Sequence, residues 1–149
     1  MHAAVMARVA RCDIFVGVAA VADYRPAEAQ PAKIKKTAGE LRLRLVKNPD
    51  ILAEVAALPG GPFTVGFAAE TEAVERHARG KLVAKGLDMI AANRVGAPGD
   101  GEGGFDSDDN ALLVLWIGGG QALPLMPKGQ LGAELADLIC ERYRASTSG

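Results

Sequence analysis

Several lysines and one aspartate of this 149-residue chain have the types and spacing that polyphosphate chemistry needs. Lys33 opens the lysine-rich segment KIKK, and Lys81 and Lys85 are four residues apart, which places them on one face of a helix. A triphosphate carries about four negative charges, and each lysine about 4 Å away contributes roughly 1–4 kcal/mol of attraction. Asp23 can hold a metal ion whose other ligands are phosphate oxygens and water. These residues predict a polyphosphate clamp, although Lys81 and Lys85 would also suit a helix C-terminus by compensating its dipole.

Other motifs in the sequence do not support competing chemistries. Gly99–Gly104 matches the pattern G-x-G-x-x-G, but no helix follows it and its two acids would repel a pyrophosphate, so we interpret it as a surface loop. Asp106–Asp109 lacks the spaced ligands, central glycine and final glutamate of an EF-hand loop, and we interpret it as a turn. His2 and His77 are isolated, and we expect His77 to be solvated on a charged helix. The sequence has neither a P-loop pattern nor a G-x-S-x-G pattern.

The composition suits a single domain, residues 1–149, in a reducing compartment. Hydrophobic residues make up 49% of the chain, which is enough to bury a core, and the net charge of -1 gives no basic surface for nucleic acid or an acidic membrane. Cys12 and Cys140 are far apart and lack metal-ligand spacing. No apolar run is long enough to cross a bilayer. We therefore expect a cytoplasmic protein without nucleic-acid or membrane partners.

Short, largely apolar runs predict strands buried on both faces, and they are Ile14–Ala20, which is apolar at every position, Phe63–Ala69, Leu87–Ala92 and Ala111–Ile117. The glycines at 118–120 turn the chain, and Gln121–Leu125 returns as a hairpin partner. Leu41–Val46 alternates instead, which predicts an edge strand or a hairpin arm. Val95–Gly104 is expected to be a loop.

Helical patterns alternate with these strands. They cover Ala3–Val9, Asp50–Leu58, Thr71–Lys85 and Gly129–Arg144, with Asn48 as the expected cap of the second helix and Ala145–Gly149 as a frayed tail. The alternation predicts an α/β protein: a three-layer Rossmann-like sandwich with a mostly parallel sheet and a C-terminal β-hairpin.

Polar residues follow the first three buried strands. Asp23 and Tyr24 come after the first strand, Glu70 and Thr71 after the second, and Asn93 and Arg94 after the third. Ligands of such sheets bind beyond the carboxyl ends of the strands, so these residues predict the rim of a site. The alternative is that every strand must simply end in something polar.

Several short segments, in this order, resemble phosphopantothenoylcysteine synthetase: AAVADYRP, KIKK, LVKNPDIL, VGFAAET, the two-lysine helix, IAANRV and FDSDDNAL. They are most similar to the bacterial CTP-using form. That form is the C-terminal domain of a bifunctional phosphopantothenoylcysteine decarboxylase/phosphopantothenate–cysteine ligase. The resemblance covers nearly the whole chain.

The resemblance implies a two-step ligase reaction of coenzyme A biosynthesis. CTP and 4′-phosphopantothenate would form an acyl-cytidylate and pyrophosphate. The amine of L-cysteine would then displace CMP. The family uses Mg²⁺ with CTP, and FMN belongs only to the fused decarboxylase domain. The resemblance also implies a homodimer and a decarboxylase partner domain.

The resemblance assigns roles to particular residues of this chain. Lys33, in a mobile flap, would be catalytic by stabilising charge while the acyl-cytidylate forms, and Asp23 would bind the nucleotide's metal. Phe67 would pack near the cytosine, and Lys81 and Lys85 would hold the triphosphate. The other contacts with CTP, largely through backbone groups, would come from Gly17, Val18, Ala19, Pro49, Asp50, Ile51 and Leu52.

The sequence departs from the family at its start. The family's synthetase domain begins with a strand, a Gly/Thr-rich turn and an asparagine-containing segment that this chain lacks, so we expect an incomplete ligase domain. Two alternatives stay open. One is a CTP-binding module without turnover, which would bind CTP but release no pyrophosphate. The other is an NAD(P)-dependent reductase, against which the missing dinucleotide fingerprint argues.

Overall fold

A computed structural model describes residues 1–28, 32, 34, 39–94 and 107–148. The chain divides into two compact units. Unit 1 comprises Met1–Ala19 together with Ile51–Gly149, and unit 2 comprises Ala20–Asp50. In the described part of the chain, no helix is both long enough and apolar enough to span a membrane.

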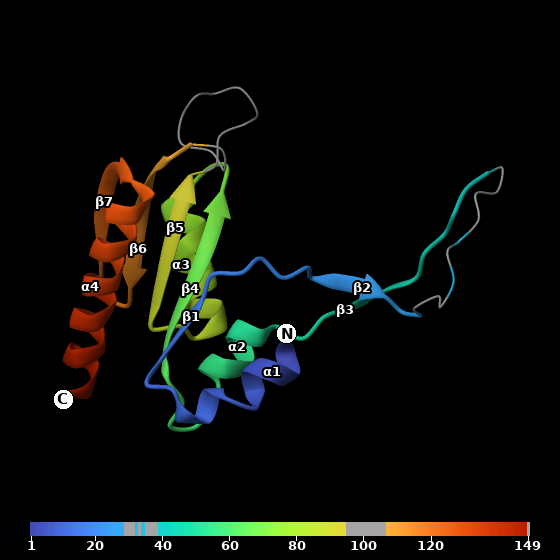
Figure 1. The fold of residues 1–149 in the computed structure, drawn as a ribbon, viewed down its shortest axis with the longest axis horizontal. Helices are drawn as coiled ribbons and strands as arrows, with labels where there is room; N and C mark the ends of the chain where they lie inside the picture. The colour runs from blue at the N-terminus through green and yellow to red at the C-terminus, as the bar shows by residue number, and fades with distance from the viewer. Residues whose placement is uncertain (29–31, 33, 35–38, 95–106, 149) are drawn as a thin grey trace. The chain divides into compact units, whose positions relative to one another are not determined.

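Unit 1 is an α/β layered structure around one five-stranded sheet (Figure 1). The strands lie in the order β1, β4, β5, β6, β7, and β1, β4 and β5 pair in parallel. β6 is antiparallel to both of its neighbours, so β7 runs in the same direction as the first three. The strands are β1 (Ile14–Gly17), β4 (Phe63–Glu70), β5 (Met89–Arg94), β6 (Asp109–Trp116) and β7 (Gly119–Pro127). The predicted α/β class, the mostly parallel sheet and the C-terminal hairpin are confirmed.

Helices cover both faces of this sheet, with α3 on one side and α4 on the other (Figure 1). The helices of unit 1 are α1 (His2–Met6), the 3₁₀ helix η1 (Val9–Arg11), α2 (Ile51–Ala56), α3 (Val74–Lys85) and α4 (Lys128–Thr147). Along β5, Met89 and Ala91 pack into the core under α4, whereas Ile90 and Ala92 pack into the core under α3. This alternation explains why Met89–Ala92 of β5 is apolar at every position.

The first strand corrects one expectation. Ile14–Ala20 was predicted to be buried on both faces, but β1 ends at Gly17 and lies at the edge of the described sheet. Val16 is 40% exposed and Val18, just beyond the strand, is 61% exposed. The cause is that β1 pairs with β4 alone, so its side chains have fewer neighbours than those of β5.

Several helix ends differ from the predicted bounds: α1 ends at Met6 rather than Val9, and α2 ends at Ala56 rather than Leu58. Two further differences have a visible cause. α3 begins at Val74 rather than Thr71, after Ala73 adopts a left-handed backbone conformation with φ 46°. α4 continues through the tail that we expected to fray, because the hydroxyls of Ser146, Thr147 and Ser148 donate hydrogen bonds to the carbonyls of Tyr143 and Arg144. These bonds satisfy carbonyls that a helix C-terminus leaves without backbone partners.

Unit 2 contains a short hairpin, β2 (Tyr24–Pro26) paired antiparallel with β3 (Leu45–Lys47). The strand predicted over Leu41–Val46 is confirmed only at its end: Leu45 and Val46 belong to β3, whereas residues 41–44 form no strand. Asn48 does not use its side chain as the expected helix cap. Its Oδ1 accepts a hydrogen bond from Arg25 Nη1 at 2.9 Å, and its Nδ2 donates to the Ala22 carbonyl at 2.7 Å. Asn48 thus closes the base of the hairpin.

Candidate functional site

The carboxyl ends of β4 and β5 coincide. Residues 69 and 70 lie opposite residues 93 and 94 in the parallel register, so Glu70 and Arg94 end their strands side by side. β1 ends earlier, because Gly17 lies opposite Gly66. Val18 and Ala19 follow β1 and are exposed to solvent. The ends of β4 and β5 in unit 1 therefore form the kind of strand-end rim at which ligands of parallel sheets bind.

Two predicted nucleotide-contact residues, Gly17 and Leu52, meet on this sheet. Leu52 of α2 lies over β1 and β4 so closely that a Cβ at Gly66 would be 2.8 Å from Leu52 Cδ2, and one at Gly17 would be 3.2 Å from Leu52 Cδ1. The two glycines therefore allow α2 to pack against the strands. The side chain of Ile51 is buried in a core with Val55, so it is not available to a ligand. The predicted contact of its backbone with the nucleotide stays a prediction.

Phe67, the predicted contact of the cytosine, lies on the other face of β4. It is partly buried against the core under α4. Leu52 packs against the core under α3, and Lys81 belongs to α3 itself. A ligand that met Phe67 and Lys81 together would have to cross the strand ends.

The predicted triphosphate lysine Lys81 makes an ion pair that the sequence analysis did not anticipate. Its Nζ lies 2.7 Å from Oε1 of Glu70, and Nδ1 of His77 lies 3.4 Å from Oε2 of the same carboxylate. The side chain of Glu70 is 12% exposed, against 48% for Lys81. The hydrogen bond from Lys81 is the main cause that lowers the pKa of Glu70, although burial acts in the opposite direction. Glu70 is therefore an anion at neutral pH.

His77 corrects the expectation of a solvated, isolated histidine. Its ring is 38% exposed and lies against Glu70. His77 and Lys81 are one helical turn apart on α3, which brings both side chains to the last residue of β4. The sequence signal for this contact is the i, i+4 spacing of His77 and Lys81 after a glutamate that ends a strand.

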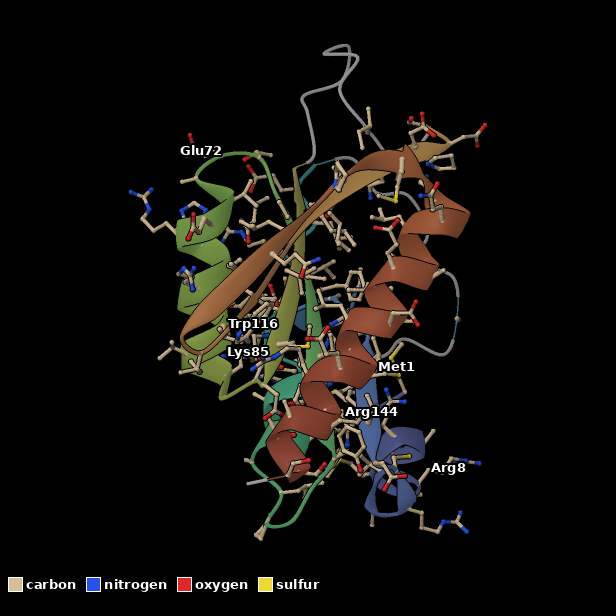
Figure 2. The ribbon with its side chains drawn as sticks, turned by 90° about the vertical axis from the view of Figure 1, so that its left-hand side faces the viewer. Met1, Arg8, Glu72, Lys85, Trp116 and Arg144 are labelled. Atoms are coloured by element: carbon tan, nitrogen blue, oxygen red, sulfur yellow. The ribbon has the colours of Figure 1, made fainter. Side chains whose placement is uncertain are left out.

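Lys85 lies at the other end of α3. Figure 2 shows Glu72 near the start of this helix and Lys85 at its end. Lys85 follows Lys81 by one turn on the same face, so it lies farther from the carboxyl edge of the sheet. Its part in holding a triphosphate stays a prediction.

The remaining predicted site residues belong to unit 2 or lie outside the described residues. Asp23, Pro49 and Asp50 are exposed residues of unit 2. Lys33, the predicted catalytic residue, and most of the KIKK segment lie outside the described residues. Within the described ranges, no group of three or more His, Cys, Asp or Glu side chains gathers around a possible metal position. A single carboxylate such as Asp23 suits a metal that arrives already bound to phosphate and water.

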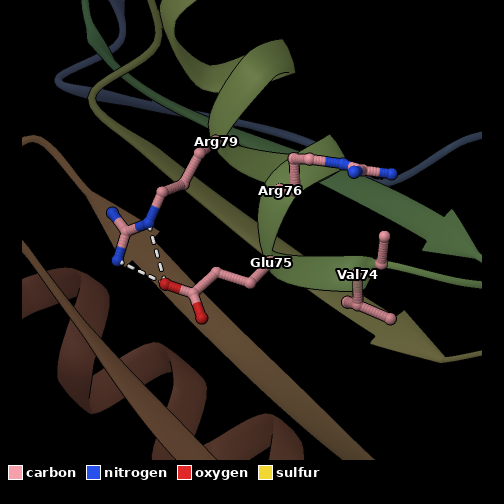
Figure 3. Close-up of a pocket in the computed structure, with 5 residues that line it drawn as sticks. Val74, Glu75, Arg76 and Arg79 are labelled. Atoms are coloured by element: carbon pink, nitrogen blue, oxygen red, sulfur yellow. Dashed lines mark hydrogen bonds and ion pairs between the residues drawn. The ribbon is translucent and has the colours of Figure 1, made fainter.

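A hollow of about 630 Å³ lies beside the first half of α3 (Figure 3). Its lining is Ala73, Val74, Glu75, Arg76 and Arg79. Glu75 Oε1 accepts a hydrogen bond from Arg79 Nε at 2.9 Å, drawn as a dashed line in Figure 3. None of the predicted site residues lines this hollow.

Comparisons with known proteins agree on one family. The family model described as the DNA/pantothenate metabolism flavoprotein C-terminal domain matches residues 1–143. The chain is 52% identical over 147 residues to "Coenzyme A biosynthesis bifunctional protein CoaBC" of Escherichia coli (strain K12), which covers 96% of this chain and 36% of that protein. The protein of the same name from Bacillus subtilis (strain 168) is 39% identical over 140 residues, 93% of this chain and 34% of that protein. The chain thus spans about a third of the length of these relatives.

Solved structures give the same picture. The crystal structure of the C-terminal domain of a Coenzyme A biosynthesis bifunctional protein CoaBC superposes with a TM-score of 0.72 and 27% identity, over 99% of this chain and 62% of that one. A DNA/pantothenate metabolism flavoprotein from Streptococcus pneumoniae, at 21% identity and a TM-score of 0.67, shares the fold.

Proposed function

The chain belongs to the family of the DNA/pantothenate metabolism flavoprotein C-terminal domain, and we propose that it acts as a phosphopantothenate–cysteine ligase of coenzyme A biosynthesis. The observation that carries this proposal is the 52% identity, over 96% of the chain, to a bifunctional protein named for coenzyme A biosynthesis. The strand-end rim of unit 1, with Lys81 beside it, supports the proposal because it offers a place for an anionic nucleotide.

The proposed reaction has two steps. The carboxylate of 4′-phosphopantothenate attacks the α-phosphorus of CTP, a P–O bond breaks, and pyrophosphate leaves with the bonding electrons. The amine of L-cysteine then attacks the acyl carbon of the acyl-cytidylate and loses a proton, and CMP leaves. Both steps develop negative charge on phosphate oxygens, which positioned cations stabilise.

Residues of this chain suit the nucleotide part of that reaction. Lys81 presents a half-exposed ammonium to the triphosphate, and the backbone of Gly17–Ala19 leaves the sheet at its open edge. Asp23 would hold the Mg²⁺ that accompanies CTP, and the ion would neutralise phosphate charge when bound. Lys33 keeps its proposed catalytic role and Phe67 its proposed contact with the cytosine.

We also propose that two copies of the chain associate. Leu41, Leu43 and Leu45 of unit 2 are more than half exposed, and alternate apolar residues beside a short hairpin form a surface that a second chain could cover. A phosphopantothenoylcysteine decarboxylase domain carrying FMN is the further partner that the family resemblance suggests.

A CTP-binding module without turnover is the second candidate. It requires only contacts with the nucleotide at the strand ends, and Lys81 beside Glu70 is a described residue that offers one.

Pyrophosphate release tests the proposed activity. The purified chain is mixed with Mg·CTP, 4′-phosphopantothenate and L-cysteine, and pyrophosphate is measured with a coupled assay while the thiol product is followed by mass spectrometry. The ligase predicts pyrophosphate and 4′-phosphopantothenoyl-cysteine in equal amounts, and less of both in Lys81→Gln. CTP binding without pyrophosphate would instead support the module.

A further inference from the structure

Glu70, the carboxylate that ends β4, has no role in the proposed reaction so far. Glu70 contacts two side chains of α3 that are one turn apart, with Lys81 Nζ 2.7 Å from one oxygen and His77 Nδ1 3.4 Å from the other. Because both oxygens have a partner on the same helix, the carboxylate is held between β4 and α3. Its position is therefore fixed by the backbone of two elements rather than by one flexible chain.

The exposure of the pair shows which charge faces outward. The Lys81 side chain is 48% exposed, whereas that of Glu70 is 12% exposed. The ammonium is therefore the more accessible of the two charges to an anion in solution. A lysine ammonium has three N–H donors, so a Lys81 that is paired with Glu70 can still donate to an incoming ligand.

We propose that Glu70, steadied by His77, is a positioning residue that holds the Lys81 ammonium in place for the triphosphate of CTP. This inference rests on the proposed function, in which Lys81 contacts the triphosphate. A lysine side chain is long and flexible, so an unrestrained Lys81 would lose rotamer freedom when the phosphate binds. The contact with Glu70 would remove much of that loss before the nucleotide arrives.

The opposite role for Glu70 is competition, in which its negative charge weakens nucleotide binding. A competing carboxylate would need to face the phosphate, but Glu70 lies largely covered behind the lysine. A positioning role depends on the length of the side chain at residue 70, which must reach Lys81. A competing role depends only on the negative charge of that side chain. The two roles therefore predict different rankings for substitutions that change length or charge alone.

Calorimetric titration of the whole chain with Mg·CTP separates these roles. Glu70→Asp keeps the charge but shortens the side chain, Glu70→Gln keeps the reach and an oxygen acceptor, and Glu70→Ala removes both. Positioning predicts that Glu70→Ala and Glu70→Asp weaken binding about tenfold, because Lys81 is no longer held, and that Glu70→Gln weakens it only about threefold. Thermal unfolding should change little in all three, since partly exposed ion pairs contribute little to stability.

A double-mutant cycle shows whether Glu70 acts through Lys81. In the Lys81→Ala background, Glu70→Ala should cause no further loss of affinity. Glu75→Ala is the control, because Glu75 also pairs with a cation of α3, Arg79, at 2.9 Å, but it does so within the helix and without Lys81. This control should bind Mg·CTP as the unchanged chain does.

The outcomes distinguish the inference from the function on which it rests. Unchanged or tighter binding in Glu70→Ala, together with a clear loss in Lys81→Ala, would overturn the positioning role and leave the proposed function standing. Equal losses for Glu70→Ala with and without Lys81 would also overturn it. Failure of the unchanged chain to bind Mg·CTP, or normal binding by Lys81→Ala, would contradict the proposed nucleotide site itself.

Discussion

The five-stranded sheet and the β2–β3 hairpin are both rich in apolar residues, but they use them differently. In the sheet, Val65, Met89 and Val114 are fully buried between the sheet and α4. In unit 2, Leu43 and Leu45 are 57% and 54% exposed. The difference shows that apolar alternation predicts strand pairing, whereas burial requires a second layer of structure.

Polar contacts take the place of a core in the hairpin. β2 and β3 share three pairs of residues. At the base of the hairpin, the side chains of Asn48 and Arg25 are hydrogen-bonded to each other, and Asn48 also bonds the Ala22 carbonyl. A two-stranded hairpin is only marginally stable by itself. Unit 1 should therefore set the global stability of the chain, and unit 2 should open locally at lower free energy.

Truncation of a core leucine should give the largest loss in the free energy of unfolding. It should also give the clearest difference between unit 1 and unit 2. Leu82→Ala removes a side chain that is 1% exposed in the core under α3, and it should lower the free energy of unfolding by about 2–5 kcal/mol. The matched change Leu43→Ala in unit 2 should alter it by no more than about 0.5 kcal/mol. Urea unfolding followed by circular dichroism measures both. A comparable loss in the two variants would show that unit 2 belongs to the same cooperative core.

A smaller effect is expected from Asn48→Ala. The variant loses two side-chain hydrogen bonds in unit 2, each contributing about 0.5–1.5 kcal/mol, and the loss should appear as local opening of the hairpin. Hydrogen exchange of the Ala27 amide, which donates to the Arg44 carbonyl at 2.8 Å, reports that opening. Gln130→Ala on α4 serves as the control and should leave this amide unchanged. Equal loss of protection in β5 would contradict the separation of the units.

Loss of the Glu70 ion pair in Glu70→Gln should have the smallest effect on the free energy of unfolding. That effect should depend on pH. The pKa of Glu70 is lowered below its ordinary value of 4.5, chiefly by the hydrogen bond from Lys81. A carboxyl whose pKa is lower in the folded state stabilises the fold above its unfolded pKa, and that contribution is lost as pH falls through the folded pKa. The stability difference between the unchanged chain and Glu70→Gln should therefore be constant near neutral pH and should shrink below about pH 4.5. A difference that grows on acidification would contradict the pairing.

The sequence predicted the middles of the central strands well, because Met89–Ala92 of β5 and Ala111–Trp116 of β6 are apolar throughout and pack on both faces of the sheet. It did not predict that β1 lies at an edge, since the same pattern gives no information about how many neighbours a strand has. The polar role of Asn48 was also missed. The short amide side chain of an asparagine can cap a helix or close a hairpin equally well. Only the tertiary structure decides which of the two roles Asn48 takes.

The sequence could suggest which residues belong to the candidate site, but it could not predict which of them contact one another. Gly17 and Leu52 were both assigned to the nucleotide, and the structure brings them into contact through the packing of α2. The contact of Glu70 with His77 and Lys81 depends on where α3 begins. Ala73 delays that start by three residues from the predicted position, and this shift was not visible from the helical spacing alone.

The most direct test of the account is a calorimetric titration of the unchanged chain with Mg·CTP, with Mg·ATP as the control nucleotide. The account predicts binding of CTP in preference to ATP, and loss of most of that binding in Lys81→Gln. Equal binding of the two nucleotides by the folded chain, or CTP affinity that Lys81→Gln leaves unchanged, would contradict a CTP site at this edge of the sheet.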